Sequence, residues 1–402
     1  MTQASKSNES QDLSQLDDIR WMRAALEWSH RGRGWNSPRP SVGCVLVRDG
    51  AIIGAGHTQP GHGNPHAEVM ALRVAASNDQ KTQGATAYVT LEPCCHTATT
   101  PPCTDALIRA GIKRVVCGVI DPNPAVDGQG YEKLRAAGVE VVTGVLEKEC
   151  IRAQDDFLKH IATHTPFVTL KCAVSLDGKI ATPTGESQWI TGQEARRRAH
   201  QLRHEHDSVL VGIETVLADD PQLNVRLEGR WSQPARVVVD SRGRLPLSAR
   251  VLHNAGPATV YIGTTEAMSQ ERHDAFVASG AQVLQTPSQD GHVDLRVLRD
   301  LLYDHGIYSI LIEGGAHIAG AALAAGIVDK IVFFIAPTII GEGRDAVVGV
   351  QVDKLTEACR LLDVEVERVG DDVMVSGYTH PIVRRADADP PLKHRAEGLE
   401  AP

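Results

Sequence analysis

The sequence lacks the features of a membrane, secreted or nucleic-acid-binding protein. No apolar run approaches the roughly 18 residues of a membrane span, and the polar start MTQASKSNESQDLSQ has no basic or apolar region typical of a secretory signal. Eight cysteines in 402 residues are too few for a disulfide framework. The net charge of -9 argues against broad binding to a phosphate backbone. We therefore expect a cytoplasmic protein that acts on a small molecule, without a nucleic-acid or membrane partner.

The length and pattern of the chain predict two α/β domains. A chain of 402 residues exceeds one ordinary core, and alternating strand and helix patterns predict mostly parallel or mixed sheets between helices. A long helical stretch, Glu147–His164, ends at Thr165-Pro166, where we place the domain junction. The expected domains cover 17–165 and 166–382, between polar segments 1–16 and 383–402 that we expect to be unfolded.

Local signals predict several elements. Asp49-Gly50 between two apolar runs predicts a β-hairpin. A helix is expected from near His66, and Pro93, just after the strand Ala85–Leu91, suits the first turn of another helix near Cys94. In the second half we expect strands at Phe167–Ser175, Ser208–Val211, Ala235–Asp240, Ala258–Ile262, Tyr308–Ile312 and Lys330–Ala336, and helices at Gln193–His204, Ala267–Ser279, Leu295–His305 and Ala316–Ala325.

His66, Cys94 and Cys103 have the ligand types of a water-activating zinc site. A catalytic zinc takes three protein ligands and keeps one position open. Glu68 lies two residues after His66 and so on a different helix face, which suits a proton carrier outside the coordination sphere. Zinc deaminases combine H-x-E with P-C-x-x-C, whereas eight residues separate the two cysteines here. The alternatives are a structural zinc site completed by Cys95 or His96, or buried cysteines without metal.

The stretch Leu311–Ala316 predicts a second functional region. A buried strand runs into Gly314-Gly315, which opens a helix, and backbone N–H groups at such a turn can approach an anion such as a pyrophosphate. A Gly-Gly pair alone fits a plain tight turn equally well.

Several longer motifs occur in order along the chain: His66-Ala67-Glu68, Leu91-Glu92-Pro93-Cys94, Thr100-Pro101-Pro102-Cys103, Asp121-Pro122-Asn123-Pro124, LKCAVSLDGKIA over 170–181, Ser187-Gln188-Trp189-Ile190-Thr191 and TVLADDP over 215–221. With these motifs the chain resembles the bifunctional deaminase–reductases of riboflavin biosynthesis, the deaminase half over 17–165 and the reductase half over 166–380. The resemblance implies an α/β protein with a cytidine-deaminase-like three-layer domain followed by a domain similar to dihydrofolate reductase.

The resemblance also implies chemistry. Zinc on His66, Cys94 and Cys103, with Glu68 as the proton shuttle, would deaminate 2,5-diamino-6-(5-phosphoribosylamino)pyrimidin-4-one. NADPH would then reduce the ribosyl to a ribityl chain. Lys171 is our candidate proton donor, and Asp177 is the second candidate for this role. Members of the family commonly assemble, which favours a homo-oligomer. By position, the residues on the NADPH side are Ala173, Trp189, Thr215, Asp219, Ser241, Glu313, Gly314, Gly315 and Ala316, and those on the substrate and phosphate side are Ser187, Arg203, Leu223 and Arg226. Lys171 and Glu313 resemble residues near the reacting ribose.

Two positions depart from the family pattern. Pro38-Arg39-Pro40 stands where the family usually has Pro-Asn-Pro, and Ala98-Thr99 stands where it has Gly followed by a cation. We hypothesise that Arg39 has taken over the substrate phosphate, since arginine suits bidentate phosphate contact; the alternative is an ordinary surface arginine. The departures also leave open a different pyrimidine phosphate as substrate. A separate alternative is an active reductase joined to a zinc-stabilised scaffold or oligomerisation domain.

Overall fold

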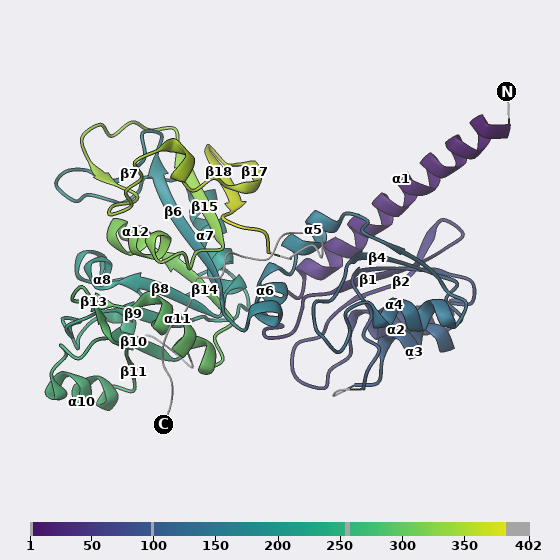
Figure 1. Cartoon of the computed structure of the whole chain (residues 1–402), viewed down its shortest axis with the longest axis horizontal. Coiled ribbons are helices and arrows are strands. Elements are labelled where there is room, and N and C mark those ends of the chain that lie inside the picture. The colour runs from purple at the N-terminus through teal and green to yellow at the C-terminus, as the bar shows by residue number, and fades with distance from the viewer. Residues whose placement is uncertain (1–2, 98–99, 254–257, 383–402) are drawn as a thin grey trace.

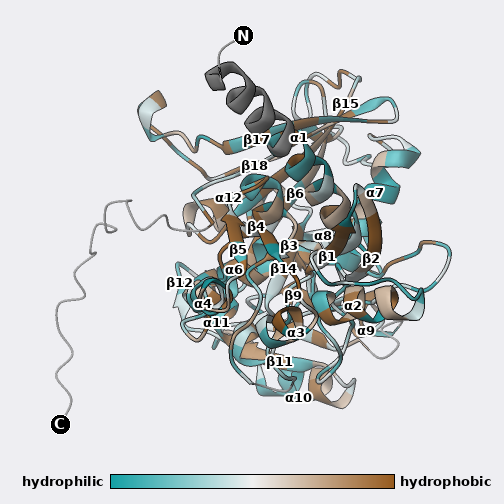
Figure 2. Cartoon of the chain, turned by 90° about the vertical axis from the view of Figure 1, so that its right-hand side faces the viewer, coloured by the Kyte–Doolittle hydropathy of each residue, from teal (hydrophilic) through white to brown (hydrophobic). Residues whose placement is uncertain are grey.

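The computed structural model describes residues 3–97, 100–253 and 258–382, with only the backbone described for 3–14. The chain forms two α/β domains that meet near helix α6 (Asp155–Thr163) (Figure 1). In Figure 2 the hydrophobic colour is concentrated on the interior strands, and the hydrophilic colour on loops at the periphery. Among the described helices, none combines the length and apolar character needed to cross a membrane.

The first domain is built on a five-stranded sheet with strand order β2-β1-β3-β4-β5. Its hairpin forms at Asp49-Gly50, as predicted, because both residues adopt the positive φ that a two-residue hairpin turn requires (51° and 72°). β3, β4 and β5 run parallel. The strands are β1 (Gly43–Arg48), β2 (Ala51–His57), β3 (Thr86–Leu91), β4 (Arg114–Val119) and β5 (Glu140–Thr143).

Helices cover both faces of this sheet, with α2, α3 and α4 on one side and α1 and α5 on the other (Figure 1). The close approach of α2 requires small residues in β2, because a Cβ on Gly54 would lie 2.3 Å from the carbonyl oxygen of Ala71. This packing fixes the start of α2, where the predicted metal ligand His66 lies. The helices are α1 (Gln3–His30), α2 (Ala67–Ser77), α3 (Cys103–Arg109), α4 (Gln129–Ala136) and α5 (Glu147–Arg152).

Three details differ from the sequence expectations. Helix α1 begins at Gln3, so the structure has helix within the segment 1–16 that we expected to be unfolded. The helix expected near Cys94 is absent from that position, and α3 begins only at Cys103. The stretch Glu147–His164 is two helices, because the chain breaks at Gln154, whose buried side-chain amide donates to the carbonyl of Thr90 at 3.1 Å. The expected unfolded tail, 383–402, lies outside the described residues.

The second domain is built on a nine-stranded sheet with order β11-β10-β9-β8-β14-β6-β15-β18-β17. The strands from β11 to β15 in this order are parallel, and β18 and β17 continue the sheet antiparallel. Buried central strands such as β14 are the continuous apolar runs typical of covered parallel sheets. The strands are β6 (Phe167–Ser175), β8 (Ser208–Gly212), β9 (Ala235–Val239), β10 (Val260–Thr264), β11 (Gln282–Gln285), β14 (Ser309–Glu313), β15 (Lys330–Ala336), β17 (Leu362–Val369) and β18 (Asp372–Tyr378).

All six strands and four helices expected in this half are present, with ends shifted by a few residues. The sequence interpretation missed α8 and the hairpin of β17 and β18. The helices are α7 (Gln193–Glu205), α8 (Ile213–Asp219), α9 (Arg250–His253), α10 (Gln270–Ala278), α11 (Leu295–Asp304) and α12 (Ala316–Ala324); two small ribbons pair β7 (Lys179–Ala181) with β16 (Arg344–Asp345) and β12 (Ser288–Gln289) with β13 (His292–Val293), and a 3-10 turn covers Leu355–Glu357.

A buried ionic cluster joins the two domains. The carboxylate of Asp155, fully buried in the first turn of α6, accepts from Arg33 at 2.8 Å, from Lys330 at 3.0 Å and from the Tyr378 hydroxyl at 2.9 Å. Lys330 and Tyr378 belong to the sheet of the second domain, whereas Arg33 follows α1. The junction therefore depends on charges from both domains.

Candidate active sites in the two domains

His66 is placed by the start of α2. It is the residue immediately before the helix and has extended backbone angles (φ -76°, ψ 167°). Its Nδ1 faces the two cysteine sulfurs, and its Nε2 lies 3.5 Å from the Thr100 hydroxyl. A partner for the outer ring nitrogen fixes the orientation of a metal-binding imidazole.

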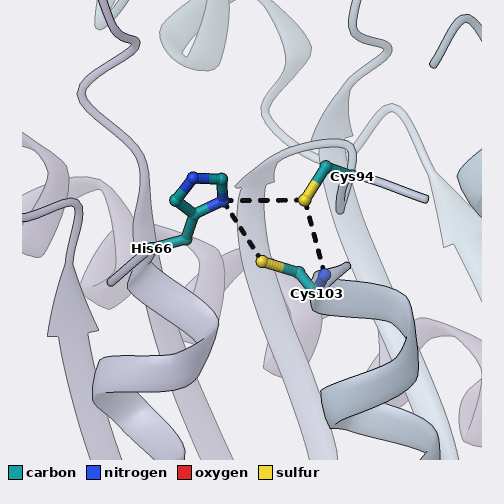
Figure 3. A group of neighbouring side chains, drawn as sticks. All are labelled: His66, Cys94 and Cys103. Carbon is teal, nitrogen blue, oxygen red and sulfur yellow. Dashed lines mark hydrogen bonds between the residues drawn. The ribbon is translucent and has the colours of Figure 1, made fainter. Parts of the chain in front are cut away.

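Cys94 and Cys103 complete a three-ligand cluster (Figure 3). The Nδ1 of His66 lies 3.6 Å from the Cys94 sulfur and 3.3 Å from the Cys103 sulfur. Tetrahedral zinc with bonds of about 2.3 Å to sulfur and 2.0 Å to nitrogen would hold these atoms about 3.5 Å apart. The two nitrogen–sulfur separations therefore match those of a zinc site.

The thiols are polarised in the manner that a metal site needs. A hydrogen bond with Cys103 and another with His66 lower the pKa of Cys94 well below its usual value, although burial opposes the shift. The hydrogen bond with Cys94 and burial raise the pKa of Cys103 well above its usual value. The backbone N–H of Cys103 also donates to the Cys94 sulfur at 3.4 Å. The deprotonated thiol is the form that binds a metal ion, so a lowered pKa at Cys94 favours metal binding at this cluster.

Glu68 lies beside this cluster in the first turn of α2 and is 3% exposed. Burial is the main cause that raises its pKa, while His66 lowers it. Among the described residues, the group of potential ligands contains His66, Cys94 and Cys103 and no fourth member. The sulfur of Cys95 instead contacts the carbonyl of Ala125 at 3.6 Å. The cluster therefore has the composition of an open site rather than a closed structural one.

Arg39 contacts the loop that leads into His66. Its guanidinium donates to the carbonyls of Gln59 at 3.2 Å, Gly61 at 2.6 Å and Asn64 at 3.1 Å. Burial lowers the pKa of Arg39, and the nearby thiols of Cys103 and Cys94 act in the opposite direction. The other departure from the family pattern, Ala98-Thr99, lies outside the described residues.

Glu92 is a residue whose role the sequence analysis missed. Its buried carboxylate accepts from the backbone N–H groups of Asp121 at 3.3 Å, Gly128 at 3.0 Å and Gly130 at 2.9 Å. These bonds tie the loop after β4 to the chain just before Cys94. The only available signal was a carboxylate directly after an apolar strand, where it would be buried.

In the second domain, Lys171, Arg203 and Glu313 form one ionic group. Glu313, at the end of β14, is directly opposite Lys171 of β6 in the parallel register. Arg203 of α7 makes two bonds to the Glu313 carboxylate, at 2.7 Å and 3.0 Å, and the Lys171 ammonium lies 3.7 Å from it. Arg203 and Lys171 outweigh the effect of burial and lower the pKa of Glu313 to about 2.

His200 adjoins this group and was also missed. It lies one turn before Arg203 on α7, and its Nδ1 accepts from the backbone N–H of Arg226 at 3.3 Å. Burial, together with the charges of Arg203 and Arg226, lowers the pKa of His200 to about 4. A lone histidine three residues before an arginine was the only sequence signal, and it indicates no more than a shared helix face.

The Gly-Gly turn adjoins Thr215, as expected if both line one cofactor site. Gly314 and Gly315 have φ values of 79° and 84°, and a Cβ on Gly315 would lie 3.1 Å from the Thr215 hydroxyl. α12 begins directly after the turn, at Ala316. Glycine is therefore needed at both positions for conformation and for space.

The other residues expected on the NADPH and substrate sides differ widely in their exposure and contacts. Trp189 is 67% exposed, with the Arg196 guanidinium 4.6 Å from its ring centroid. The Ser241 hydroxyl accepts from the backbone of Val293. Leu223 is buried at 2% exposure, Ala173 and Ser187 are half-buried, and Asp219 and Arg226 are exposed.

Comparisons with known proteins match both halves of the chain. Residues 16–119 match the cytidine and deoxycytidylate deaminase zinc-binding region, and residues 166–375 match the RibD C-terminal domain. The riboflavin biosynthesis protein RibD of Aquifex aeolicus is 42% identical over 89% of this chain and 97% of its own length. RibD of Escherichia coli is 41% identical over 89% of this chain and 98% of its own length.

Solved structures agree over the same extent. The Thermotoga maritima diaminohydroxyphosphoribosylaminopyrimidine deaminase/5-amino-6-(5-phosphoribosylamino)uracil reductase has a TM-score of 0.77 and 37% identity, covering 91% of this chain and 99% of its own. Acinetobacter baumannii RibD has a TM-score of 0.75 and 39% identity, and the match covers 90% of this chain and 99% of its own. The expected family and fold, a cytidine-deaminase-like domain followed by a dihydrofolate-reductase-like one, are confirmed: the chain belongs to the RibD family of bifunctional deaminase–reductases of riboflavin biosynthesis.

Proposed function

We propose that the first domain removes the 2-amino group of 2,5-diamino-6-(5-phosphoribosylamino)pyrimidin-4-one with zinc held by His66, Cys94 and Cys103. The observation that carries this proposal is a cluster of three ligand atoms within 4.8 Å of one another beside a buried Glu68. Zinc, when bound, supplies an activated water. Glu68 takes the proton released by that water and gives it to the departing amino group, which leaves as ammonia.

A purely structural zinc domain fits the residues less well. Such a site takes four ligands, and a buried carboxylate next to an open position would be expensive to keep without a chemical use. Glu68 therefore supports the catalytic alternative.

For the second domain, the substrate is the deaminated pyrimidine and the nicotinamide cofactor is NADPH, which supplies hydride to C1′ of the open-chain ribose. Lys171 donates the proton to the other end of the reduced bond. The ionic group of Lys171, Arg203 and Glu313 supports this role because it holds an ammonium at a fixed place in a largely buried setting. The turn at Gly314-Gly315, with Thr215 beside it, offers backbone N–H groups to the cofactor phosphates.

The remaining residues of the NADPH side are Ala173, Trp189, Asp219, Ser241, Glu313 and Ala316, and those of the substrate side are Ser187, Arg203, Leu223 and Arg226. Arg39 contacts the substrate phosphate of the deaminase. Three N–H groups of the guanidinium bond to backbone carbonyls, which leaves two to bind a phosphate. The position of Arg39 close to the thiols of Cys103 and Cys94 supports this role. Cytoplasmic location and a homo-oligomer stay predictions; sedimentation velocity of the purified chain would test the second.

One experiment tests the reaction sequence. Purified enzyme is given the diaminopyrimidine ribosyl phosphate, and ammonia and product mass are followed before and after NADPH is added. We expect ammonia in the first step and a gain of two hydrogens in the second. Glu68→Gln should abolish ammonia release while retaining zinc, whereas Glu132→Gln, an exposed control on α4, should behave as wild type. Release of no ammonia by wild type would refute the deaminase proposal.

A further inference from the structure

Trp35 of the deaminase domain packs against the reductase domain. Its ring meets the imidazole of His204, near the end of α7, edge to face with centroids 5.1 Å apart. His204 meets Trp231 in the same manner at 4.9 Å, and the Arg230 guanidinium lies 5.8 Å from the Trp35 ring. His204 is thus held between two indoles, one from each domain.

The backbone next to Trp35 fixes this contact. Gly34 has a φ of 78°, and a Cβ at this position would lie 2.4 Å from the carbonyl oxygen of His204. The preceding Arg33 pairs with Glu205 of α7 at 3.5 Å while also bonding to Asp155. The chain around Trp35 therefore lies directly on the end of α7, without room for a sliding displacement.

On its other side, His204 contacts a loop of the reductase domain, residues 221–234, which lies between α8 and β9. The backbone N–H of Ser232 donates to Nδ1 of His204 at 3.1 Å. The side chain of Gln233 then bonds to both backbone groups of Val225, at 2.9 Å and 3.2 Å. The part of the loop next to Trp231 is thereby tied to the part that carries Arg226.

The start of the loop lies over the ionic group of the reductase site. The carbonyl of Asn224 accepts from Arg203 at 2.9 Å, and the N–H of Arg226 donates to His200. A continuous series of contacts thus runs from Trp35 through His204 and the loop to Arg203. The turn Gly314-Gly315 directly follows Glu313, the partner of Arg203, and has a separate support in Thr215 of α8.

We propose that Trp35 is a positioning residue for the reductase reaction: it holds the loop 221–234 so that Arg226 and Arg203 are correctly placed for the pyrimidine phosphate. The proposal rests on the assignment of these two arginines to the substrate side. The loop carries Arg226 and the Asn224 carbonyl that holds Arg203, whereas Glu313 keeps Lys171 as a second partner. Loss of Trp35 therefore acts first on the affinity for the pyrimidine substrate and leaves the hydride step and the binding of the nicotinamide cofactor nearly unchanged.

The test is steady-state reductase kinetics of the full chain, started from the deaminated pyrimidine ribosylamino phosphate so that the first reaction does not limit the second. We expect Trp35→Ala to raise the KM for this substrate about tenfold, the size expected for the loss of edge-to-face and cation–π contacts. The kcat and the KM for NADPH should stay within about twofold, and Trp35→Phe should restore most of the affinity.

Lys148→Ala is the matched control, since Lys148 pairs with Asp363 at a different part of the domain junction. Its KM should equal that of wild type. An unchanged KM in Trp35→Ala, an equal rise in Lys148→Ala, or a parallel loss of kcat and NADPH affinity would each overturn the proposal. Failure of wild type to oxidise NADPH would instead refute the proposed reductase function.

A second variant covers the case in which Trp35→Ala does not fold. Trp231→Ala changes the other indole on His204 and should raise the same KM to a similar extent. In the double-mutant cycle of Trp35→Leu and Trp231→Leu, which removes both aromatic rings, the KM of the double variant should be close to that of the stronger single variant, because both act through His204. Simple additivity of the two effects would contradict the series of contacts.

Discussion

The buried carboxylate of Asp155 should determine how firmly the two domains hold together. It faces two cations and a hydroxyl within 3.0 Å and has no exposed surface. Asp155→Asn keeps the size of the side chain but removes the negative charge, and leaves Arg33 and Lys330 as neighbouring cations. Breaking a buried ion pair from one side costs about 3–5 kcal/mol. Since Arg33 keeps Glu205 at 3.5 Å, we expect a loss of about 3 kcal/mol.

Urea unfolding followed by tryptophan fluorescence measures this loss. With a slope of about 3 kcal/mol per molar urea, the midpoint should fall by about 1 M. Asp155→Asn combined with Lys330→Met should recover part of the loss, because the second substitution removes one of the two facing cations. A loss below about 1 kcal/mol, or no recovery in the double variant, would refute the view that the junction depends on this charge.

The same carboxylate predicts a dependence on pH. Lys330 and Arg33 hold the pKa of Asp155 below its ordinary value, against the effect of burial. A carboxyl group with a lowered pKa in the folded state contributes its stabilisation fully above its ordinary pKa of about 3.9, and loses it as the pH falls further. Wild type should therefore lose more stability than Asp155→Asn between pH 5 and pH 3, measured by urea unfolding at each pH.

Four further substitutions test the two sites. Cys103→Ser should reduce the bound zinc measured in the purified protein, whereas Cys95→Ser should retain it, since only the first residue belongs to the ligand cluster. Arg203→Lys should lower reductase kcat/KM by about tenfold to a hundredfold, because a lysine cannot reproduce the two parallel bonds to Glu313; normal kcat/KM would contradict this. Gly315→Ala should weaken NADPH binding and destabilise the protein by about 1–3 kcal/mol, since Gly315 has φ 84° and ψ 115°, a conformation that alanine strongly disfavours. An unaltered NADPH affinity in fluorescence titrations would contradict the assignment of this turn to the cofactor.

The zinc ligands and the first hairpin could be predicted from the sequence because their signals are local. Asp49-Gly50 determines its own turn, and the ligand types of His66, Cys94 and Cys103 indicate a metal whatever the path of the chain between them. The family resemblance supplied the fold of the second domain, which strand and helix patterns alone restrict only to an α/β arrangement.

The missed features depend on contacts between distant parts of the chain. Pro93 predicted a helix near Cys94, but the backbone carbonyl there accepts instead from the N–H of Thr104, so the segment stays open until α3. The helix break at Gln154 depends on a bond to Thr90, 64 residues earlier. Neither interaction has a pattern that could be recognised in the sequence, because each requires the fold to bring its partners together.

One short segment connects the two sites. Arg39 contacts the loop that precedes the zinc ligand His66, whereas Arg33 and Trp35, a few residues before it, contact α7 of the other domain. Between them the Ser37 hydroxyl donates to Asp207 at 3.0 Å. A linker alone would only keep the two activities close together. If Arg39 and Arg203 hold substrate as proposed, contacts at both ends of this segment make the substrate side of each site depend on how the domains are docked. The proposal thus gives the domain junction a part in positioning substrate, and it predicts that substitutions along the junction change KM as well as stability.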